Sequence, residues 1–177
     1  VETERIVSAL RGQLRSLRKR GLVLGVSGGI DSSVSTALAV RAVGAQNVCC
    51  LFMPENDSDP ESLRLGQLLT QTFGVEGIVE DIGPSLKAMG CYERRDSFIR
   101  KLVPDYGPGW ASKIVIANAL EGAAYNISWL VVQDPEGNQS RHRMTPEVYL
   151  GIVAATNMKQ RTRKQIEYYH ADRLNFA

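Results

Sequence analysis

The sequence predicts an α/β fold in which a doubly wound parallel sheet carries helices on both faces. Short apolar runs, typical of buried strands, alternate with longer segments whose apolar residues recur at helical spacing. The 177 residues are 44% hydrophobic and 23% charged, which is ordinary for one globular domain spanning 1–177. A turn rich in glycine and serine joins the first apolar run to a helical segment, the place where open sheets of this class bind ligands.

The first half of the chain has the element order of such a sheet. Ile6, Leu10 and Leu14 recur at helical spacing and predict an opening helix over 3–19 with a solvated basic face. The elements predicted after it are a strand at 22–26, a helix at 31–44, a strand at 48–53, a helix at 60–73 and a strand at 77–82. A helix that joins two parallel strands crosses over with a right-handed sense, so this order predicts a parallel sheet.

The pattern changes beyond Pro84. Breaker residues at 104–109 separate two helical stretches, and turn residues at 134–138 separate the two strands of a predicted β-hairpin. The elements predicted here are helices at 85–103 and 111–121, hairpin strands at 125–132 and 140–144, and a helix at 146–173 with a break near Ala155.

The composition excludes several classes of protein. Lys and Arg total 21 against 19 Asp and Glu, and the net charge of +2 is too small to indicate a nucleic-acid groove. No apolar run reaches the roughly 18 residues of a membrane-spanning helix, so we expect a soluble, cytoplasmic protein. Cys49, Cys50 and Cys91 have neither disulfide nor zinc-site spacing, and the first two are expected in the core. His142 and His170 are interpreted as surface or packing residues.

The segment from Gly25 to Ser33, Gly-Val-Ser-Gly-Gly-Ile-Asp-Ser-Ser, has the chemistry of a phosphate cradle. Gly28 and Gly29 allow a tight turn and a close approach of the ligand, with positive φ expected at Gly29. Successive N–H groups and the N-terminus of the next helix attract an anion. Three serine hydroxyls add donors: Ser27, Ser32 and Ser33. The structural alternative is a strand-to-helix turn in which Asp31 and Ser32 are capping residues.

The details of this loop exclude the commoner phosphate loops. A Walker loop requires a lysine after its last glycine, but Ile30 stands five positions after Gly25 and no lysine follows. A dinucleotide fingerprint requires a glycine where Ser27 stands. Asp31 would repel phosphates unless a divalent cation lay between them, so we assign Asp31 to Mg²⁺.

Ser27-Gly-Gly-Ile-Asp-Ser-Ser33 after an apolar strand resembles the signature of the PP-loop ATP pyrophosphatases, an adenine nucleotide alpha hydrolase-like superfamily with a Rossmann-like sheet. Its members cleave ATP between the α- and β-phosphates, and they include NAD, GMP, asparagine and argininosuccinate synthetases and tRNA-modifying enzymes. The resemblance implies that Met53, at the end of the second strand, lies near the adenine. The acidic stretch at 55–59 is interpreted as a solvated loop, and a role in shielding or assisting metal binding is the alternative.

A second segment, Asn157-Met-Lys-Gln-Arg-Thr-Arg163, resembles a stretch of NAD synthetases that lies on a helix of the subunit interface and contributes to the deamido-NAD site. The resemblance implies substrate-binding roles for Asn157, Lys159 and Arg161. Helical spacing places Asn157, Arg161 and Lys164 on one face, and cations there suit an acidic, dinucleotide-like substrate. A solvated basic face is the alternative.

The sequence departs from ammonia-dependent NAD synthetases in two ways. The stretch from Ile82 to Asn157 is longer than the connection expected in a minimal family member, so we expect an insertion with a β-hairpin over 84–150. A lid, a dimer arm and a substrate-selecting subdomain all remain open as its role. The family also continues into a further strand and a second Mg²⁺-binding acid, so we expect the chain to be C-terminally incomplete.

The resemblance implies an ATP-dependent amide-forming ligase like NAD synthetase, which adenylates a carboxylate with release of pyrophosphate and then amidates it with ammonia. Asp31, Ser27 and Ser32 are the expected catalytic residues. The expected ATP- and pyrophosphate-binding residues are Gly25, Val26, Ser27, Gly28, Gly29, Ile30, Asp31, Ser32, Ser33 and Met53.

The expected partners are a deamido-NAD-like acidic substrate, ammonia or an ammonia-donating protein, and a second copy of the chain in a homodimer built partly from 146–173. No membrane or nucleic-acid partner is expected. The alternatives are another PP-loop ligase or sulfurtransferase that acts on a small carboxylate or on tRNA, and a nucleotide-binding or oligomerisation module without turnover.

Overall fold

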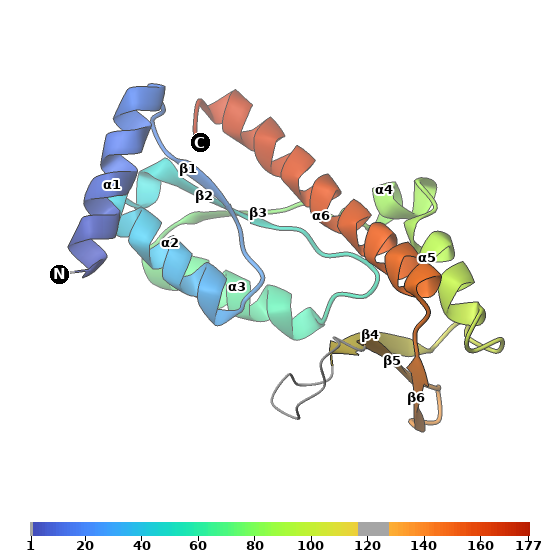
Figure 1. The fold of residues 1–177 in the computed structure, drawn as a ribbon. Coiled ribbons are helices and arrows are strands. Elements are labelled where there is room, and N and C mark those ends of the chain that lie inside the picture. The colour runs from blue at the N-terminus through green and yellow to red at the C-terminus, as the bar shows by residue number, and fades with distance from the viewer. Residues whose placement is uncertain (1, 117–127) are drawn as a thin grey trace. The chain divides into compact units, whose positions relative to one another are not determined.

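The computed structural model describes residues 2–116 and 128–177 (Figure 1). The chain forms two compact units: Val1–Leu86 with Gln160–Ala177, and Lys87–Lys159. We call them the first and the second unit. The expected organisation, one domain with an insertion over 84–150, stays a prediction, because compactness alone does not show that a segment was inserted.

The first unit is built on a parallel sheet of strands β1 (Leu22–Gly25), β2 (Val48–Phe52) and β3 (Glu76–Val79) in that order. All five residues of the central strand β2 are buried, which explains why the strand is an unbroken apolar run. Along the outer edge of β1, the Ala177 N–H donates to the Gly21 carbonyl at 2.9 Å and the Val23 N–H donates to the Ala177 carbonyl at 2.8 Å.

Helices cover both faces of this sheet, as predicted. The helices α2 (Ile30–Val43) and α3 (Pro60–Phe73) lie on one face, and residues 160–174 of α6 (Pro146–Leu174) lie on the other (Figure 1). The opening helix α1 (Glu2–Leu17) packs against α2, and the short 3₁₀ helix η1 (Ala45–Asn47) precedes β2. Asp59 caps α3 by accepting from the Glu61 N–H, and Gly74 ends it in the left-handed conformation.

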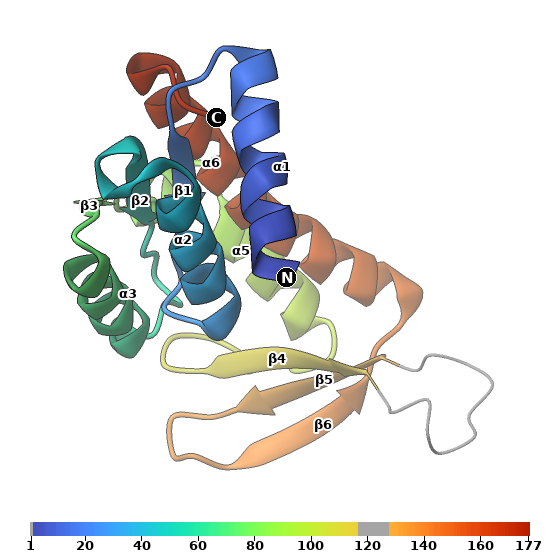
Figure 2. The same ribbon diagram turned by 90° about the vertical axis from the view of Figure 1, so that its left-hand side faces the viewer.

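The second unit contains an antiparallel sheet of strands β4 (Ala111–Ile116), β5 (Ser128–Gln133) and β6 (Gln139–Arg143), in the order β4-β5-β6 (Figure 2). The predicted hairpin is therefore confirmed as β5 and β6. The sheet packs with α5 (Cys91–Arg100) and residues 146–159 of α6. The buried core of this unit consists of Ile99, Val103, Tyr106, Leu130, Val132, Val148 and Ile152.

Two elements in this half of the chain were wrongly predicted. The predicted helix at 111–121 is strand β4 over its first six residues, because Ile114 pairs with the buried Leu130 across the sheet; residues 117–121 lie outside the described residues. The predicted helix at 85–103 is divided into α4 (Gly83–Ala88) and α5 at Gly90, whose φ is +68°. Residues 125–127 of the predicted hairpin strand also lie outside the described residues.

The helix α6 has no break near Ala155. Ala155 is buried, and its carbonyl accepts from the Cys91 thiol at 3.3 Å. Four residues earlier, the absence of a Cβ at Gly151 makes room for Phe98, whose ring carbons would lie 2.4 Å from such an atom. Close packing on this side, rather than a change of direction, explains the small residues in this part of the helix.

The three cysteines are free and buried, as predicted for Cys49 and Cys50. Burial raises the pKa of the Cys49 thiol to about 11, with a further contribution from the negative charge of Glu76. Within residues 2–116 and 128–177, no helix combines the length and the apolar character that crossing a bilayer would require.

A buried histidine ties the last turns of α6 to the end of β3. The His170 ring is 3% exposed, and its Nδ1 atom accepts from Arg173 at 2.8 and 3.0 Å. Because arginine only donates, Nδ1 carries no proton, and His170 Nε2–H donates to Glu80 at 2.8 Å. His170 is therefore a packing residue, as predicted, with both ring nitrogens hydrogen-bonded.

Replacing His170 with alanine should lower the free energy of unfolding by about 2–4 kcal/mol, since it removes a buried ring and leaves two charged partners without their hydrogen bonds. The matched control is Asp172→Ala, an exposed acid on the same helix, which should change the value by less than about 0.5 kcal/mol. Urea denaturation measures both, and equal effects would show that the network adds nothing to stability.

Candidate nucleotide site

The glycine-serine loop leaves the sheet at the carboxyl end of β1. Gly25 ends the strand, and the Val26 N–H still donates to the Leu51 carbonyl of β2 at 2.9 Å. Gly29 is the N-cap of α2 and makes no side-chain capping hydrogen bond. The first turn of α2 therefore presents N–H groups and the positive end of the helix dipole at the loop, an arrangement that favours an anion.

The left-handed residue of the loop is Gly28, not Gly29. Gly28 has φ +75°, and a Cβ there would lie 2.6 Å from the Ser62 carbonyl oxygen. Gly29 has φ −80°, and a Cβ there would meet only the Ser27 hydroxyl, at 3.4 Å. The expectation of positive φ at Gly29 is therefore wrong, because the chain makes its tight turn one residue earlier, against the start of α3.

The serine hydroxyls are held by the loop itself. Ser32 and Ser33 each donate to the Gly29 carbonyl at 2.9 Å, and the Ser27 and Ser32 hydroxyl oxygens lie 3.4 Å apart. Asp31 lies in the first turn of α2 with an exposed side chain. The hydroxyls would turn away from the carbonyl to donate to a ligand, whereas the backbone N–H groups at the start of α2 already point out of the helix.

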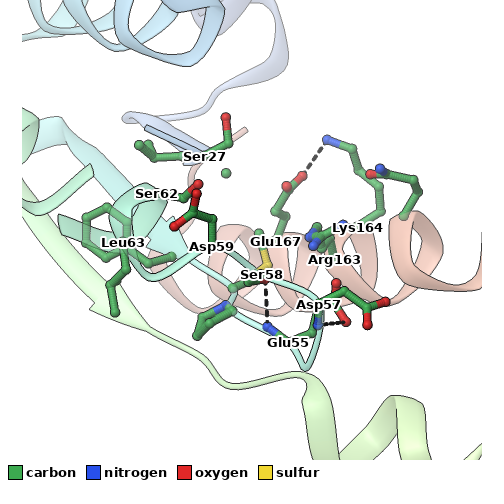
Figure 3. Close-up of a pocket in the computed structure, with 16 residues that line it drawn as sticks. Ser27, Glu55, Asp57, Ser58, Asp59, Ser62, Leu63, Arg163, Lys164 and Glu167 are labelled. Atoms are coloured by element: carbon green, nitrogen blue, oxygen red, sulfur yellow. Dashed lines mark hydrogen bonds and ion pairs between the residues drawn. The ribbon is translucent and has the colours of Figure 1, made fainter. Parts of the chain in front are cut away.

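Beside this loop lies a cleft of about 480 Å³ that is formed entirely by the first unit (Figure 3). Its walls come from the end of β1, the end of β2 with the loop after it, the start of α3 and one face of α6. The lining residues are Gly25, Val26, Ser27, Phe52, Met53, Pro54, Glu55, Asp57, Ser58, Asp59, Ser62, Leu63, Gln160, Arg163, Lys164 and Glu167.

The cleft has an apolar wall and two charged walls. Phe52, Met53 and Leu63 supply apolar surface at the end of β2 and the start of α3. The loop at 55–59 brings carboxylates, and α6 brings Arg163 and Lys164 opposite them (Figure 3). A cleft with one apolar side and polar groups at its edges suits a ligand that has a flat base and charged substituents.

The acidic loop at 55–59 is exposed at Asn56, Asp57 and Asp59, as expected for a solvated loop, and it also lines the cleft. The Glu55 N–H donates to the Ser58 hydroxyl at 3.0 Å, and the Asp57 N–H donates to the Glu55 carboxylate at 3.1 Å. Asp59 is engaged as the cap of α3. These hydrogen bonds fold the loop back towards the end of β2. The composition of the loop did not indicate this conformation.

The structure divides the predicted nucleotide-binding residues between the cleft and the loop beside it. Four of them line the cleft: Gly25, Val26, Ser27 and Met53. The others continue directly from Ser27 through the turn into α2 without lining the cleft: Gly28, Gly29, Ile30, Asp31, Ser32 and Ser33. Among the described residues, no group of three or more His, Cys, Asp or Glu side chains could hold a metal ion.

The three predicted substrate residues are not among those that line this cleft. Asn157 and Lys159 belong to the second unit, and Arg161 is an exposed residue of α6 that does not line the cleft. The α6 residues that do line it are Gln160, Arg163, Lys164 and Glu167. Their spacing of three and four positions marks one helix face and was visible in the sequence, but nothing in the sequence showed that this face meets the end of β1.

A family model described as NAD synthase matches residues 2–102, which is more than half of the chain and includes the whole glycine-serine loop. The chain belongs to the NAD synthase family. It is 84% identical over 176 residues to an NH3-dependent NAD(+) synthetase of Rhizobium meliloti, covering 99% of this chain and 53% of that protein. It is 64% identical to the protein of the same description from Rhizobium rhizogenes, with the same coverage.

Two solved structures show a similar fold. An NH3-dependent NAD synthetase of Campylobacter jejuni matches 98% of this chain and 52% of its own length, with a TM-score of 0.59 and 20% identity. An NAD+ synthetase of Burkholderia pseudomallei matches 99% and 58%, with a TM-score of 0.55 and 21% identity. The chain thus spans about half the length of the curated relatives it matches.

The two loop glycines should respond differently to alanine. Gly28→Ala should lower the free energy of unfolding by about 1–3 kcal/mol, because a left-handed residue would gain a Cβ that meets a backbone oxygen. Gly29→Ala should cost less than about 1 kcal/mol, because its backbone conformation suits any residue. Urea denaturation of both variants checks this, and a larger loss at Gly29 would contradict the observed turn.

Proposed function

We propose that this chain forms the ATP-binding part of an NH3-dependent NAD synthetase. The observation that carries the proposal is the Ser27–Ser33 loop, which runs from the end of the parallel strand β1 into a helix N-terminus that has no side-chain capping hydrogen bond, beside a cleft. The 84% identity to the Rhizobium meliloti synthetase over 176 residues supports the choice within the superfamily.

The proposed reaction has two steps. A carboxylate of the acidic substrate attacks the α-phosphorus of ATP, and the bond to the bridging oxygen breaks, so that pyrophosphate leaves with the electron pair. Ammonia then attacks the acyl-adenylate carbonyl, and AMP leaves as the amide forms. The N–H groups at the start of α2 would bind the leaving pyrophosphate. Negative charge develops on it in the transition state, and fixed hydrogen-bond donors stabilise that charge most.

Asp31 would hold Mg²⁺ at this loop. The ion typically takes one or two protein carboxylates and completes its coordination with phosphate oxygens and water, so a single exposed carboxylate beside the cradle fits it. When bound, Mg²⁺ would offset the negative charge of the phosphates. Ser27 would donate to the same phosphates, and Ser32 would do so after turning from the Gly29 carbonyl.

Different cations of α6 would bind the two acidic ligands, ATP and the second substrate. Arg163 and Lys164 face the nucleotide cleft, and Arg163 can grip a phosphate with two N–H donors. Arg161 is left for the acidic second substrate, together with Asn157 and Lys159. Met53 would contact the adenine from the apolar wall.

Product analysis tests the proposed function directly. The full-length protein that carries this sequence should convert ATP, deamido-NAD and ammonia into NAD, AMP and pyrophosphate in the presence of Mg²⁺. AMP and pyrophosphate formed only with another carboxylate or with tRNA would favour a different PP-loop enzyme. ATP binding without any product would favour a module without turnover.

Asp31→Ala should reduce Mg²⁺-dependent turnover by about 100-fold or more, since several kcal/mol of charge stabilisation would be lost. Its free energy of unfolding should change by less than about 0.5 kcal/mol, because the side chain is exposed. Steady-state rates over a Mg²⁺ series, with urea denaturation as the folding control, measure both. Wild-type turnover in the variant would remove Asp31 from the metal site.

We also propose that α6 joins two copies of the chain. Tyr168 and Tyr169 expose 69% and 61% of their surface on adjacent positions of α6, and exposed aromatic residues beside arginine are favoured interface anchors.

Light scattering should show a dimer at micromolar concentration, and Tyr168→Ser with Tyr169→Ser should weaken it. Arg161→Ala should raise the KM of the acidic substrate more than that of ATP. A wild-type monomer, or an unchanged KM, would contradict a substrate site shared between copies.

A further inference from the structure

The side chain of Glu167 is more enclosed at the nucleotide cleft than a surface ion pair with Lys164 would require. It extends from α6 into the cleft and is only 16% exposed, whereas its partner Lys164, which donates to Oε2 at 2.5 Å, is 70% exposed (Figure 3). An ion pair on a helix surface would leave both groups in water. Here the carboxylate is enclosed and the ammonium is outside.

The missing side chain of Gly25 makes room for this carboxylate. A Cβ on Gly25 would lie 2.5 Å from Glu167 Oε1 and 3.1 Å from the Met53 methyl group. The glycine at the end of β1 thus allows an acceptor from a distant helix to reach the carboxyl edge of the sheet. Among the residues that the structure describes, only Lys164 donates to Glu167, and it donates to the other oxygen.

Glu167 Oε1 is a hydrogen-bond acceptor that faces the part of the cleft where the ribose of a nucleotide would lie. Gly25 pairs with Leu51 at the end of the sheet and lines the cleft together with Ser27, two residues further along the chain, and Met53, whose methyl group would lie 3.1 Å from a Cβ on Gly25. A nucleotide with its phosphates at Ser27 and its base against Met53 would set its ribose at Gly25. An ionised carboxylate only accepts hydrogen bonds, so it selects a donor such as a hydroxyl group and offers nothing to a phosphate oxygen.

We propose that Glu167 Oε1 accepts a hydrogen bond from a ribose hydroxyl of the bound nucleotide and thereby selects ribonucleotides. This inference rests on the proposed function only in that the cleft binds ATP. Lys164 offsets the charge of the carboxylate, so that Glu167 can face the sugar without opposing the phosphates next to it. Glu167 is then a specificity residue of the nucleotide, separate from the recognition of the acidic substrate.

The test measures equilibrium binding of ATP, 2′-deoxy-ATP, 3′-deoxy-ATP and ITP to the full-length protein that carries this sequence, without ammonia or the acidic substrate. The wild type should bind ATP about 10- to 100-fold more tightly than at least one deoxy analogue, the range of a hydrogen bond to a charged group. Glu167→Ala should bind ATP as weakly as the wild type binds that analogue, and should bind the analogue unchanged.

Two further variants separate recognition from folding. Glu167→Gln keeps the size and one acceptor oxygen, so it should lose less discrimination than Glu167→Ala. Asp172→Ala removes an exposed acid from the same helix and should discriminate as the wild type does. Thermal unfolding confirms that each variant is folded at the temperature of the measurement.

Several results would overturn the inference. One is a wild type that binds ATP and both deoxy analogues equally. Another is a Glu167→Ala variant that weakens all four nucleotides by the same factor, and a third is a loss of discrimination only against ITP, which would assign Oε1 to the base amine. Selective ATP binding without NAD formation would overturn the proposed function alone, whereas a wild type that binds no ATP would overturn both.

Discussion

The burial of β2 on both faces is the constraint on which the first unit depends. The strand has helices α2 and α3 on one side and the end of α6 on the other, and its parallel neighbours must end at the same edge. Because parallel strands align their carboxyl ends, the loop after β1 and the loop after β2 face one cleft. The position of the phosphate loop beside an apolar wall follows from this one buried strand.

The elements of the first unit could be predicted because each carries its own signal. β1 and β2 are unbroken apolar runs, and α3 has Asp59 and Pro60 at its start and Gly74 at its end. The strand β4 was wrongly predicted as the start of a helix, although Ile114 and Val115 are β-branched residues that favour a strand. Pairing with β5, which is distant in the sequence, decides in favour of the strand.

The candidate site shows the same division between local and distant information. The glycine-serine loop is a local pattern, so its residues and its place at the end of β1 were predictable, although which glycine takes the left-handed conformation was not. The contribution of α6 was not predictable, because the rotation of a helix about its axis is set by what it packs on. The burial of Thr162 and His170 turns Arg163 and Glu167 towards the cleft and leaves Arg161 outside it.

The enclosed position of Cys49 in β2 also bears on resistance to oxidation. Burial raises the pKa of this thiol to about 11, so the thiol stays protonated at neutral pH. The thiolate, and not the thiol, attacks peroxides and disulfides, so the chemistry that makes cysteines redox sensors is suppressed here. The burial of the central strand between its helices therefore also protects its sulfur atoms from oxidation.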